Sequence, residues 1–151
     1  MRTKFMALCL AVCTTTAVQA DNSAGVTSVK SMHSVAETTQ RFEQILAAKG
    51  MTLFTVIDHQ AGAQKAGLSL RETQVVIFGN PKVGTPLMQC EQQVALDLPQ
   101  KALIWEDEQG DVWFSYNEPS YLKSRHSIAG CDAVLKKVSG ALAKFAQAAT
   151  Q

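Results

Sequence analysis

The order of apolar and polar residues along the chain first predicts strands. Runs rich in β-branched and aromatic residues that are bounded by Gly, Asn, Pro or Asp are typical of strands. A longer run with a Gln-Gly pair near its middle is typical of a hairpin with its turn at Gln109 and Gly110. Five strands are therefore expected, single ones in GVTSVKS (25–31), MTLFTVID (51–58) and TQVVIFG (73–79) and a pair in KALIWEDEQGDVWFSYN (101–117).

Other segments have the apolar spacing of helices. In SVAETTQRFEQILAAKG (34–50), Ser34 and Glu37 have the spacing of a capping box, and Gly50 stands where a left-handed residue ends a helix. HQAGAQKAGLSLRE (59–72) predicts a short helix stopped by Gly67. A last helix is expected from Asp132 onward, with an apolar stripe of Val134, Leu135, Val138, Leu142 and Phe145.

This order of elements predicts an α+β domain, a β-α-β(4)-α two-layer sandwich. Two long helices cover only one face of a five-stranded, mainly antiparallel sheet. With a hairpin loop of two or four residues, Trp105 lies opposite Phe114 and Leu103 opposite Tyr116, and this apolar face meets the helices. The other face is a candidate surface for a ligand, a partner or a second copy, or else an ordinary solvated face. It is expected to carry Ala102, Ile104, Glu106, Trp113, Ser115 and Asn117.

The first 20 residues have the pattern of a secretory signal peptide. Arg2 and Lys4 precede the apolar stretch FMALCLAVC, and AVQA ends with small residues. We therefore expect cleavage before Asp21, one domain over 21–151 and a periplasmic or secreted protein. The apolar stretch is far shorter than the roughly 20 residues that span a bilayer, so no membrane partner is expected after cleavage. A lipoprotein anchored at Cys13 is the alternative.

The charge and the cysteines of the chain further limit the classes of function that it can have. Without Arg2 and Lys4 the chain has 12 basic and 13 acidic side chains, a net charge of −1, which gives nucleic acid binding no electrostatic support. Cys90 and Cys131 are the two cysteines that remain after cleavage, and in an oxidising compartment they are expected to form a disulfide. The alternative is a reactive thiolate at Cys131, because it stands at a helix start.

The segment FGNPKVGTPLMQ (78–89) is a candidate anion site. Asn80 and Pro81 predict a turn, and Thr85 is expected to cap a helix whose first residue is Pro86. Free backbone N–H groups at such a helix start, with Lys82 close by, favour an anion. No Gly-Lys-Ser/Thr follows the glycines, so a nucleotide loop is not supported. The alternative is that Gly and Pro only shape the turn.

Histidines offer no recognisable metal motif. His33, His59 and His126 lie in three separate segments, so neither a metal nor another cofactor is expected. An acid–base or metal pocket would require His59 and His126 to converge with Asp58 or Glu106. A metal or redox accessory protein would require free Met88 and Cys90 beside a histidine.

Three blocks of the chain resemble the bacterial and archaeal domain-of-unknown-function family 302, in the family's order: IDHQAGAQKAGL, VVIFGNPKVGTPLMQ and LDLPQKALIWEDEQGDVWFSYNEPSYLKSRH. The resemblance extends from about Val26 to Ala148. It implies a β-α-β(4)-α fold of the TATA-box-binding-protein-like class, without DNA binding and without an established activity. The positions that match the family pattern are Asp58, His59, Asn80, Pro81, Gly84, Thr85, Pro86, Asp97, Trp105, Tyr116, Asn117, Pro119, Arg125 and His126.

Taken together, the sequence favours an exported, non-catalytic domain that binds a small ligand, an anion or a protein partner, with a homodimer as a further option. The expected location is between the GNPKVGTP segment and the open sheet face. An enzyme that uses His59 or His126 with Asp58 or Glu106 is the alternative. The candidate ligand-binding residues are Asp58, His59, Asn80, Lys82, Thr85, Glu106, Asn117 and His126.

Overall fold

The computed structural model describes residues 25–151, so the expected signal peptide and the cleavage before Asp21 lie outside the described residues. The elements in chain order are β1 (Val26–Lys30), α1 (Val35–Ala48), β2 (Thr52–Asp58), α2 (His59–Lys65), β3 (Thr73–Gly79), α3 (Pro81–Cys90), the 3-10 helix η2 (Gln92–Leu96), β4 (Gln100–Glu106), β5 (Val112–Asn117), α4 (Pro119–His126) and α5 (Asp132–Thr150).

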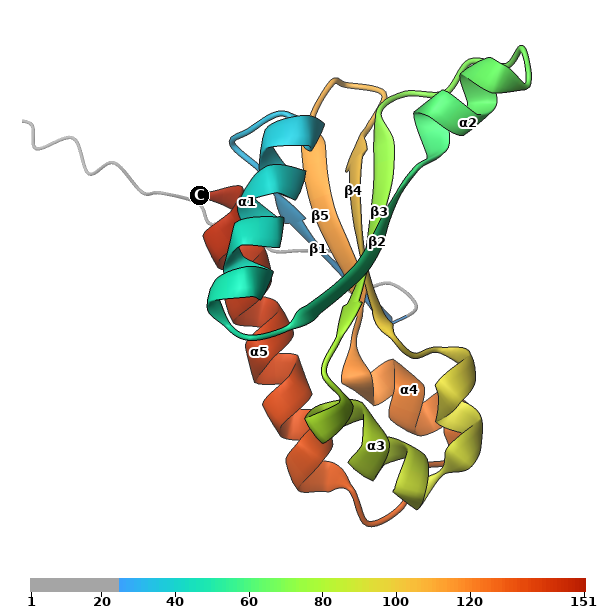
Figure 1. Ribbon diagram of the computed structural model, residues 1–151, viewed down its shortest axis with the longest axis vertical. Helices are drawn as coiled ribbons and strands as arrows, with labels where there is room; N and C mark the ends of the chain where they lie inside the picture. The colour runs from blue at the N-terminus through green and yellow to red at the C-terminus, as the bar shows by residue number, and fades with distance from the viewer. Residues whose placement is uncertain (1–24) are drawn as a thin grey trace, which may run out of the picture.

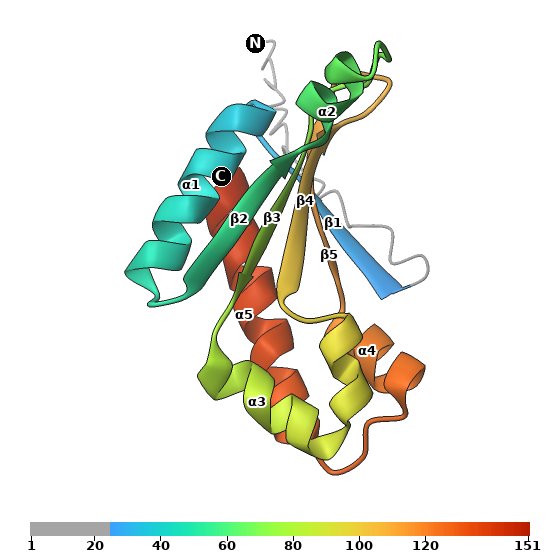
Figure 2. The same ribbon diagram turned by 45° about the vertical axis from the view of Figure 1, so that its right-hand side comes forward.

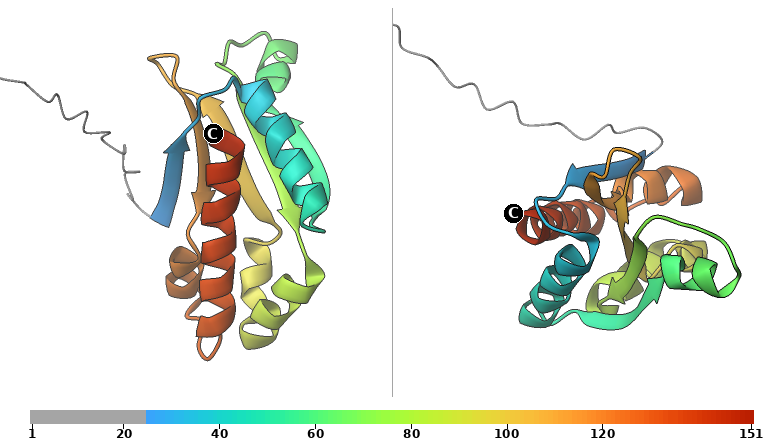
Figure 3. Two further views of the ribbon diagram at one scale, coloured as in Figure 1. Left: turned by 90° about the vertical axis from the view of Figure 1, so that its left-hand side faces the viewer. Right: turned by 90° about the horizontal axis from the view of Figure 1, so that it is seen from above.

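The five strands form one sheet in the order β1-β5-β4-β3-β2, and every neighbouring pair is antiparallel. Helices α1 and α5 lie side by side on the same face of this sheet (Figures 1 and 3). An antiparallel sheet with one covered face is a stable arrangement because only its inward-pointing side chains must be apolar. The predicted α+β fold with β-α-β(4)-α order is therefore confirmed.

Helix α1 begins and ends where its capping residues predict. The Ser34 hydroxyl accepts a hydrogen bond from the Glu37 backbone N–H at 3.2 Å, and Gly50 has the positive φ of +63° expected after the C-terminus. On its buried face, the Phe42 ring packs edge-on against Phe78 and Phe114 at centroid distances of 5.0 and 4.9 Å. These three rings join α1 to the centre of the sheet.

The hairpin register differs from the prediction by one residue. Ile104 lies opposite Phe114, and Trp105 lies opposite Trp113. The loop between Glu106 and Val112 holds five residues, and Gly110 has a φ of +80° that permits the bulged turn such odd loops contain. An odd loop reverses which residues of β4 face inward, because successive side chains of a strand point to opposite faces.

The two faces of the sheet therefore have a different composition from the one expected. Ala102 and Ile104 are buried under the helices together with Phe114 and Tyr116, whereas Leu103 and Trp105 belong to the open face. Phe114 and Tyr116 were correctly predicted to face inward. The error concerns β4, where the prediction had assumed a loop of two or four residues.

Shorter helices gather at the two ends of the sheet. Helix α2 lies beyond one end, while α3, η2 and α4 lie beyond the other, beside the N-terminal half of α5 (Figures 1 and 2). Helix α5 has 19 residues and is about 28 Å long, and it extends past the sheet toward α3. The half of α5 that has no sheet to cover packs against α3 instead.

Candidate functional site

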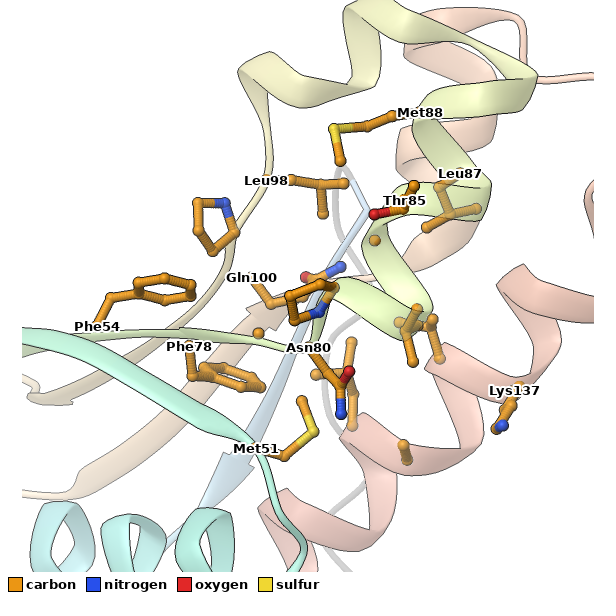
Figure 4. Close-up of a pocket in the computed structure, with 18 of the residues that line it drawn as sticks. Met51, Phe54, Phe78, Asn80, Thr85, Leu87, Met88, Leu98, Gln100 and Lys137 are labelled. Carbon is orange, nitrogen blue, oxygen red and sulfur yellow. The ribbon is translucent and has the colours of Figure 1, made fainter.

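A cavity of about 480 Å³ lies where α3, α5 and one end of the sheet meet (Figure 4). Pockets for small molecules typically have volumes of about 300–1,000 Å³. The largest share of its wall is apolar and comes from four segments that are distant in sequence, 51–54, 78–88, 95–100 and 137–145. The lining residues are Met51, Phe54, Phe78, Gly79, Asn80, Pro81, Val83, Gly84, Thr85, Leu87, Met88, Ala95, Leu98, Pro99, Gln100, Lys137, Val138, Ala141, Leu142 and Phe145.

The cavity exists because α3 packs loosely. Leu87 is the buried residue of this ten-residue helix, and its other side chains are partly or fully exposed. Helix α3 therefore contacts the rest of the molecule along a narrow line. Between this line and the stripe of α5 that carries Val138 and Leu142, the side chains leave an apolar space.

Helix α3 starts five residues earlier than predicted. Asn80 is its N-cap, and the Asn80 side chain accepts a hydrogen bond from the Lys82 backbone N–H at 2.9 Å. Pro81 occupies the first helical position, which it favours because it has no N–H to satisfy. Thr85 and Pro86 lie inside the helix, so the prediction that Thr85 caps it is wrong.

The earlier start also removes the free amides on which the anion hypothesis depended. The Val83 and Gly84 N–H groups both donate to the Asn80 carbonyl at 2.9 Å. Lys82 N–H is bound to the Asn80 side chain, and Pro81 has no N–H. The amides of the first helical turn are thus satisfied within the protein, and Lys82 itself is exposed and outside the cavity lining.

The lining contains few polar groups. Among the described residues, Lys137 of α5 is its one ionisable side chain, and Figure 4 shows it at the edge of the lining, away from Phe54 and Phe78. The Thr85 hydroxyl and the Gln100 amide make no side-chain hydrogen bond among residues 25–151. The wall can therefore hold an apolar molecule and offers it a small number of hydrogen bonds.

Of the residues expected to bind a ligand, Asn80 and Thr85 line this cavity. The sequence pattern did not identify α5 as the opposite wall, because its apolar residues are also those of an ordinary core helix. One signal was present: Ala141 is a small residue in a stripe of larger ones. The GNPKVGTP segment therefore faces α5. The expectation that it would form a site with the open face of the sheet is wrong.

A second group of polar residues surrounds Asp97, at the end of η2. His126 Nε2 lies 2.5 Å from Asp97 Oδ2, and Arg125 Nε lies 3.2 Å from the same oxygen. The Tyr121 hydroxyl accepts a hydrogen bond from Arg125 at 2.8 Å, and this bond and Asp97 raise the pKa of Arg125. The His126 side chain is only 5% exposed. This cluster ties α4 to η2 and so fixes Leu98, the next residue after Asp97, in the cavity wall.

Asp58, His59 and Glu106 lie at the opposite end of the sheet from this cluster. Asp58 caps α2 by accepting a hydrogen bond from the Ala61 N–H at 2.8 Å, and His59 is exposed at the first position of that helix. Helices α2 and α4 lie at opposite ends of the molecule (Figure 1), so His59 and His126 do not converge. In the part of the chain that the structure describes, no three metal-ligating side chains form a group.

The remaining predicted residues have local roles. Asn117 ends β5, opposite Val26 on the edge strand. His33 lies near the end of the chain, with Nδ1 3.0 Å from a Glu37 carboxylate oxygen and Nε2 3.3 Å from the Gln151 carbonyl. None of these positions contributes to the cavity lining.

Cys90 and Cys131 form a disulfide with Cα atoms 6.4 Å apart, as expected. Cys90 ends α3, and Cys131 is the N-cap of α5. The bond therefore joins the two helices on either side of the cavity. It also consumes both thiols, so neither a reactive thiolate at Cys131 nor a metal site at Met88 and Cys90 is formed.

The open face of the sheet carries two tryptophans whose polar atoms are satisfied. Trp105 Nε1 donates to the Ser115 hydroxyl at 2.9 Å, and Trp113 Nε1 donates to Asp107 Oδ2 at 2.7 Å. The Trp113 bond is the main reason why the pKa of Asp107 is lowered. Ser115, which accepts the Trp105 bond, is buried.

Comparison with protein families matches residues 27–145 to the family described as "Domain of unknown function DUF302". A solved structure titled "Crystal structure of uncharacterized conserved protein DUF302 from Bacillus stearothermophilus" has the same fold, with a TM-score of 0.76 over 83% of this chain and 98% of that one. The two sequences are 17% identical.

Curated relatives are longer than this chain. The "Fluoride-specific ion channel FluC 1" of Brucella suis biovar 1 (strain 1330) is 45% identical over 126 residues, which cover 81% of this chain and 50% of the relative. The protein of the same name in Brucella abortus biovar 1 (strain 9-941) is also 45% identical, over 47% of its length. The chain thus spans about half the length of these relatives. Within residues 25–151, every helix is too short or too polar to cross a membrane.

Proposed function

Since the chain belongs to the DUF302 family, whose description assigns no activity, we propose from the site itself that the domain binds a small, largely apolar molecule between α3 and α5 and does not transform it. The observation that carries this proposal is the apolar lining of the 480 Å³ cavity. Transfer of apolar surface from water into such a lining is favourable by about 25 cal/mol per Å².

The contacts on the two sides of the cavity support this function. Met88 and Leu98 lie on one side of the lining and Met51 and Phe78 on the other (Figure 4). Methionine side chains adapt to ligands of different shape because they are unbranched and polarisable. Phe54 is 54% exposed at the edge of the cavity, so part of its ring is available to a ligand.

Acid–base catalysis has less support. A general acid or base must lie within about 3 Å of the proton that it transfers. Within residues 25–151, the lining offers one ionisable group, Lys137, whereas His126 and Asp97 bond to each other and join α4 to η2. The names of the Brucella relatives refer to proteins about twice as long as the shared stretch, so they assign no activity to this domain.

Probe binding tests the proposal directly. The uncharged dye N-phenyl-1-naphthylamine fluoresces more strongly in apolar surroundings, and the protein is expected to bind it. Ala141→Leu places three additional carbon atoms in the cavity and is expected to weaken dye binding at least tenfold, because Ala141 lines the cavity on α5.

Ala143→Leu is the matched control for this substitution. Ala143 lies on the same helix but is exposed and outside the lining, and this change is expected to leave dye binding unaltered. Circular dichroism and thermal unfolding would show that both variants fold. Equal dye binding by Ala141→Leu and the wild type, or no dye binding by the wild type, would contradict the proposed function.

A further inference from the structure

We propose that the molecule bound in this cavity is an amphiphile with one negatively charged head group, which contacts Lys137 while its apolar part lies between α3 and α5. This inference rests on the proposed binding function and adds the charge of the ligand to it. It follows from the distribution of charge around the cavity.

Lys137 determines the sign of charge that the cavity accepts. In the part of the chain that the structure describes, it is the one ionisable side chain of the lining, and no carboxylate accompanies it there. Among residues 25–151, Lys137 makes no ion pair. An anionic head group would therefore gain a partner at the edge of an otherwise uncharged cavity, whereas a cationic head group would be repelled.

The rest of α5 has the same sign of charge. The helix carries Lys136, Lys137 and Lys144 but a single acidic residue, Asp132, which pairs with Lys123 of α4. Like charges on one helix raise the local concentration of anions near it and lower that of cations. The charge of α5 is thus complementary to an anion, although the chain as a whole is close to neutral.

Three ligands with ten carbon atoms each separate charge from apolar burial. Decanoate, decanol and decylamine compete with N-phenyl-1-naphthylamine for the wild-type protein at neutral pH and low salt. Decanoate is expected to bind about fivefold more tightly than decanol, which corresponds to the roughly 1 kcal/mol of one accessible ion pair. Decylamine, which is positively charged at this pH, is expected to bind more weakly than decanol.

Variants of Lys137 test whether this side chain causes the preference for decanoate over decanol. Lys137→Gln is expected to abolish the difference between decanoate and decanol while leaving decanol affinity unchanged, and Lys137→Glu to make decylamine the tighter ligand. Lys82→Gln is the matched control, because Lys82 is an exposed lysine of α3 outside the lining. It is expected to retain the preference for decanoate.

The outcomes distinguish this inference from the function on which it rests. If wild type binds decanoate and decanol equally and Ala141→Leu weakens both, the cavity binds apolar molecules but the charge inference is wrong. If Lys82→Gln and Lys137→Gln lose the preference for decanoate over decanol to the same extent, general surface charge and not Lys137 is responsible. That result would also contradict the charge inference. If the wild type binds the dye but none of the three ligands displaces it, the charge inference alone fails. If the wild type does not bind the dye, both proposals fail.

Discussion

Single residues at the lower end of the sheet each hold two elements together. Glu118 is an example: one carboxylate oxygen accepts from the Thr27 hydroxyl at 2.6 Å and the other from the Ser139 hydroxyl at 3.2 Å. This side chain therefore links β1 to α5 beside Tyr116, which is only 4% exposed. Burial and the nearby Glu118 charge raise the pKa of Tyr116 to about 12. Packing around Tyr116 thus favours the uncharged, protonated form of its hydroxyl.

Tyr116 is expected to make stability depend on pH above 10. The folded protein keeps the Tyr116 proton up to about pH 12, whereas the unfolded chain loses it near pH 10. Because the unfolded state then binds fewer protons, the free energy of unfolding falls as pH rises from about 10 to 12, and the contribution is fully present below pH 10. Denaturant unfolding at a series of pH values measures this change.

Tyr116→Phe provides the control for the alkaline effect. The chain has two tyrosines, so the ultraviolet absorbance of tyrosinate in the folded wild type is expected to show a late-titrating group that the variant lacks. Ionisation of both tyrosines near pH 10 in the folded protein would contradict the assignment to burial.

At the scale of elements, α3 depends on its links to α5. One buried side chain, Leu87, anchors it, and the Cys90–Cys131 disulfide fixes its last residue to the N-cap of α5. The Cys131 sulfur also lies 3.6 Å from the Pro86 carbonyl. Since α3 and α5 form opposite walls of the cavity, the disulfide connects the stability of the domain with the shape of its candidate site.

Replacement of both cysteines by serine is expected to weaken the domain and the site together. Closure of a loop of 41 residues removes denatured-state entropy equivalent to about 4 kcal/mol. For a domain of this size, such a loss lowers the melting temperature by about 15 °C. Dye binding at 20–25 °C, well below the transition, is also expected to weaken because α3 is less firmly held.

Reduction of the wild type is the companion measurement. A reducing agent is expected to lower the melting temperature of the wild type toward that of the double variant and to leave the double variant unchanged. Two reactive thiols in unreduced, denatured protein would show that the bond is absent and contradict the prediction.

At the scale of the whole molecule, export remains our proposal. The disulfide supports it, because such bonds persist in oxidising compartments and are rare in the cytosol. The basic and apolar segments before Asp21 support it independently. Protein recovered from the periplasm of an expressing cell is expected to begin at Asp21, which N-terminal sequencing would show. A first residue of Met1, or a lipid on Cys13, would contradict this prediction.

Local patterns in the sequence were sufficient for most of the architecture. Ser34, Gly50 and Gly67 fixed helix ends because caps and left-handed residues act within a few positions of the chain. The strands followed from β-branched and aromatic content, and the cysteine pair followed from the exclusion of the cysteines in the signal segment. These features depend on neighbours in sequence or on counting, so one chain is enough to predict them.

Two local features, the hairpin register and the start of α3, could not be predicted from the sequence pattern alone. The hairpin register depended on whether the loop after Glu106 has an odd or an even number of residues, and the bonds of Gly110 and Asp107 that determine this form only in the folded turn. The start of α3 depended on competition between Asn80 and Thr85 for the N-cap. Asn80 is the N-cap and Pro81 occupies the first helical position, although Pro86 predicts a later start.

The candidate site was decided by tertiary structure. Met51, Leu98 and Ala141 are far apart in sequence and read individually as ordinary core residues, and they surround one cavity only because α5 extends past the sheet and packs against a loosely anchored α3. Asp97 and His126 meet for the same reason, 29 positions apart. The sequence by itself predicted the five strands, the helices α1, α2 and α5, their order and the disulfide. The position of the cavity and of its one charged group, Lys137, came from the packing of helices on the sheet, because the distance between two walls is a property of the whole fold.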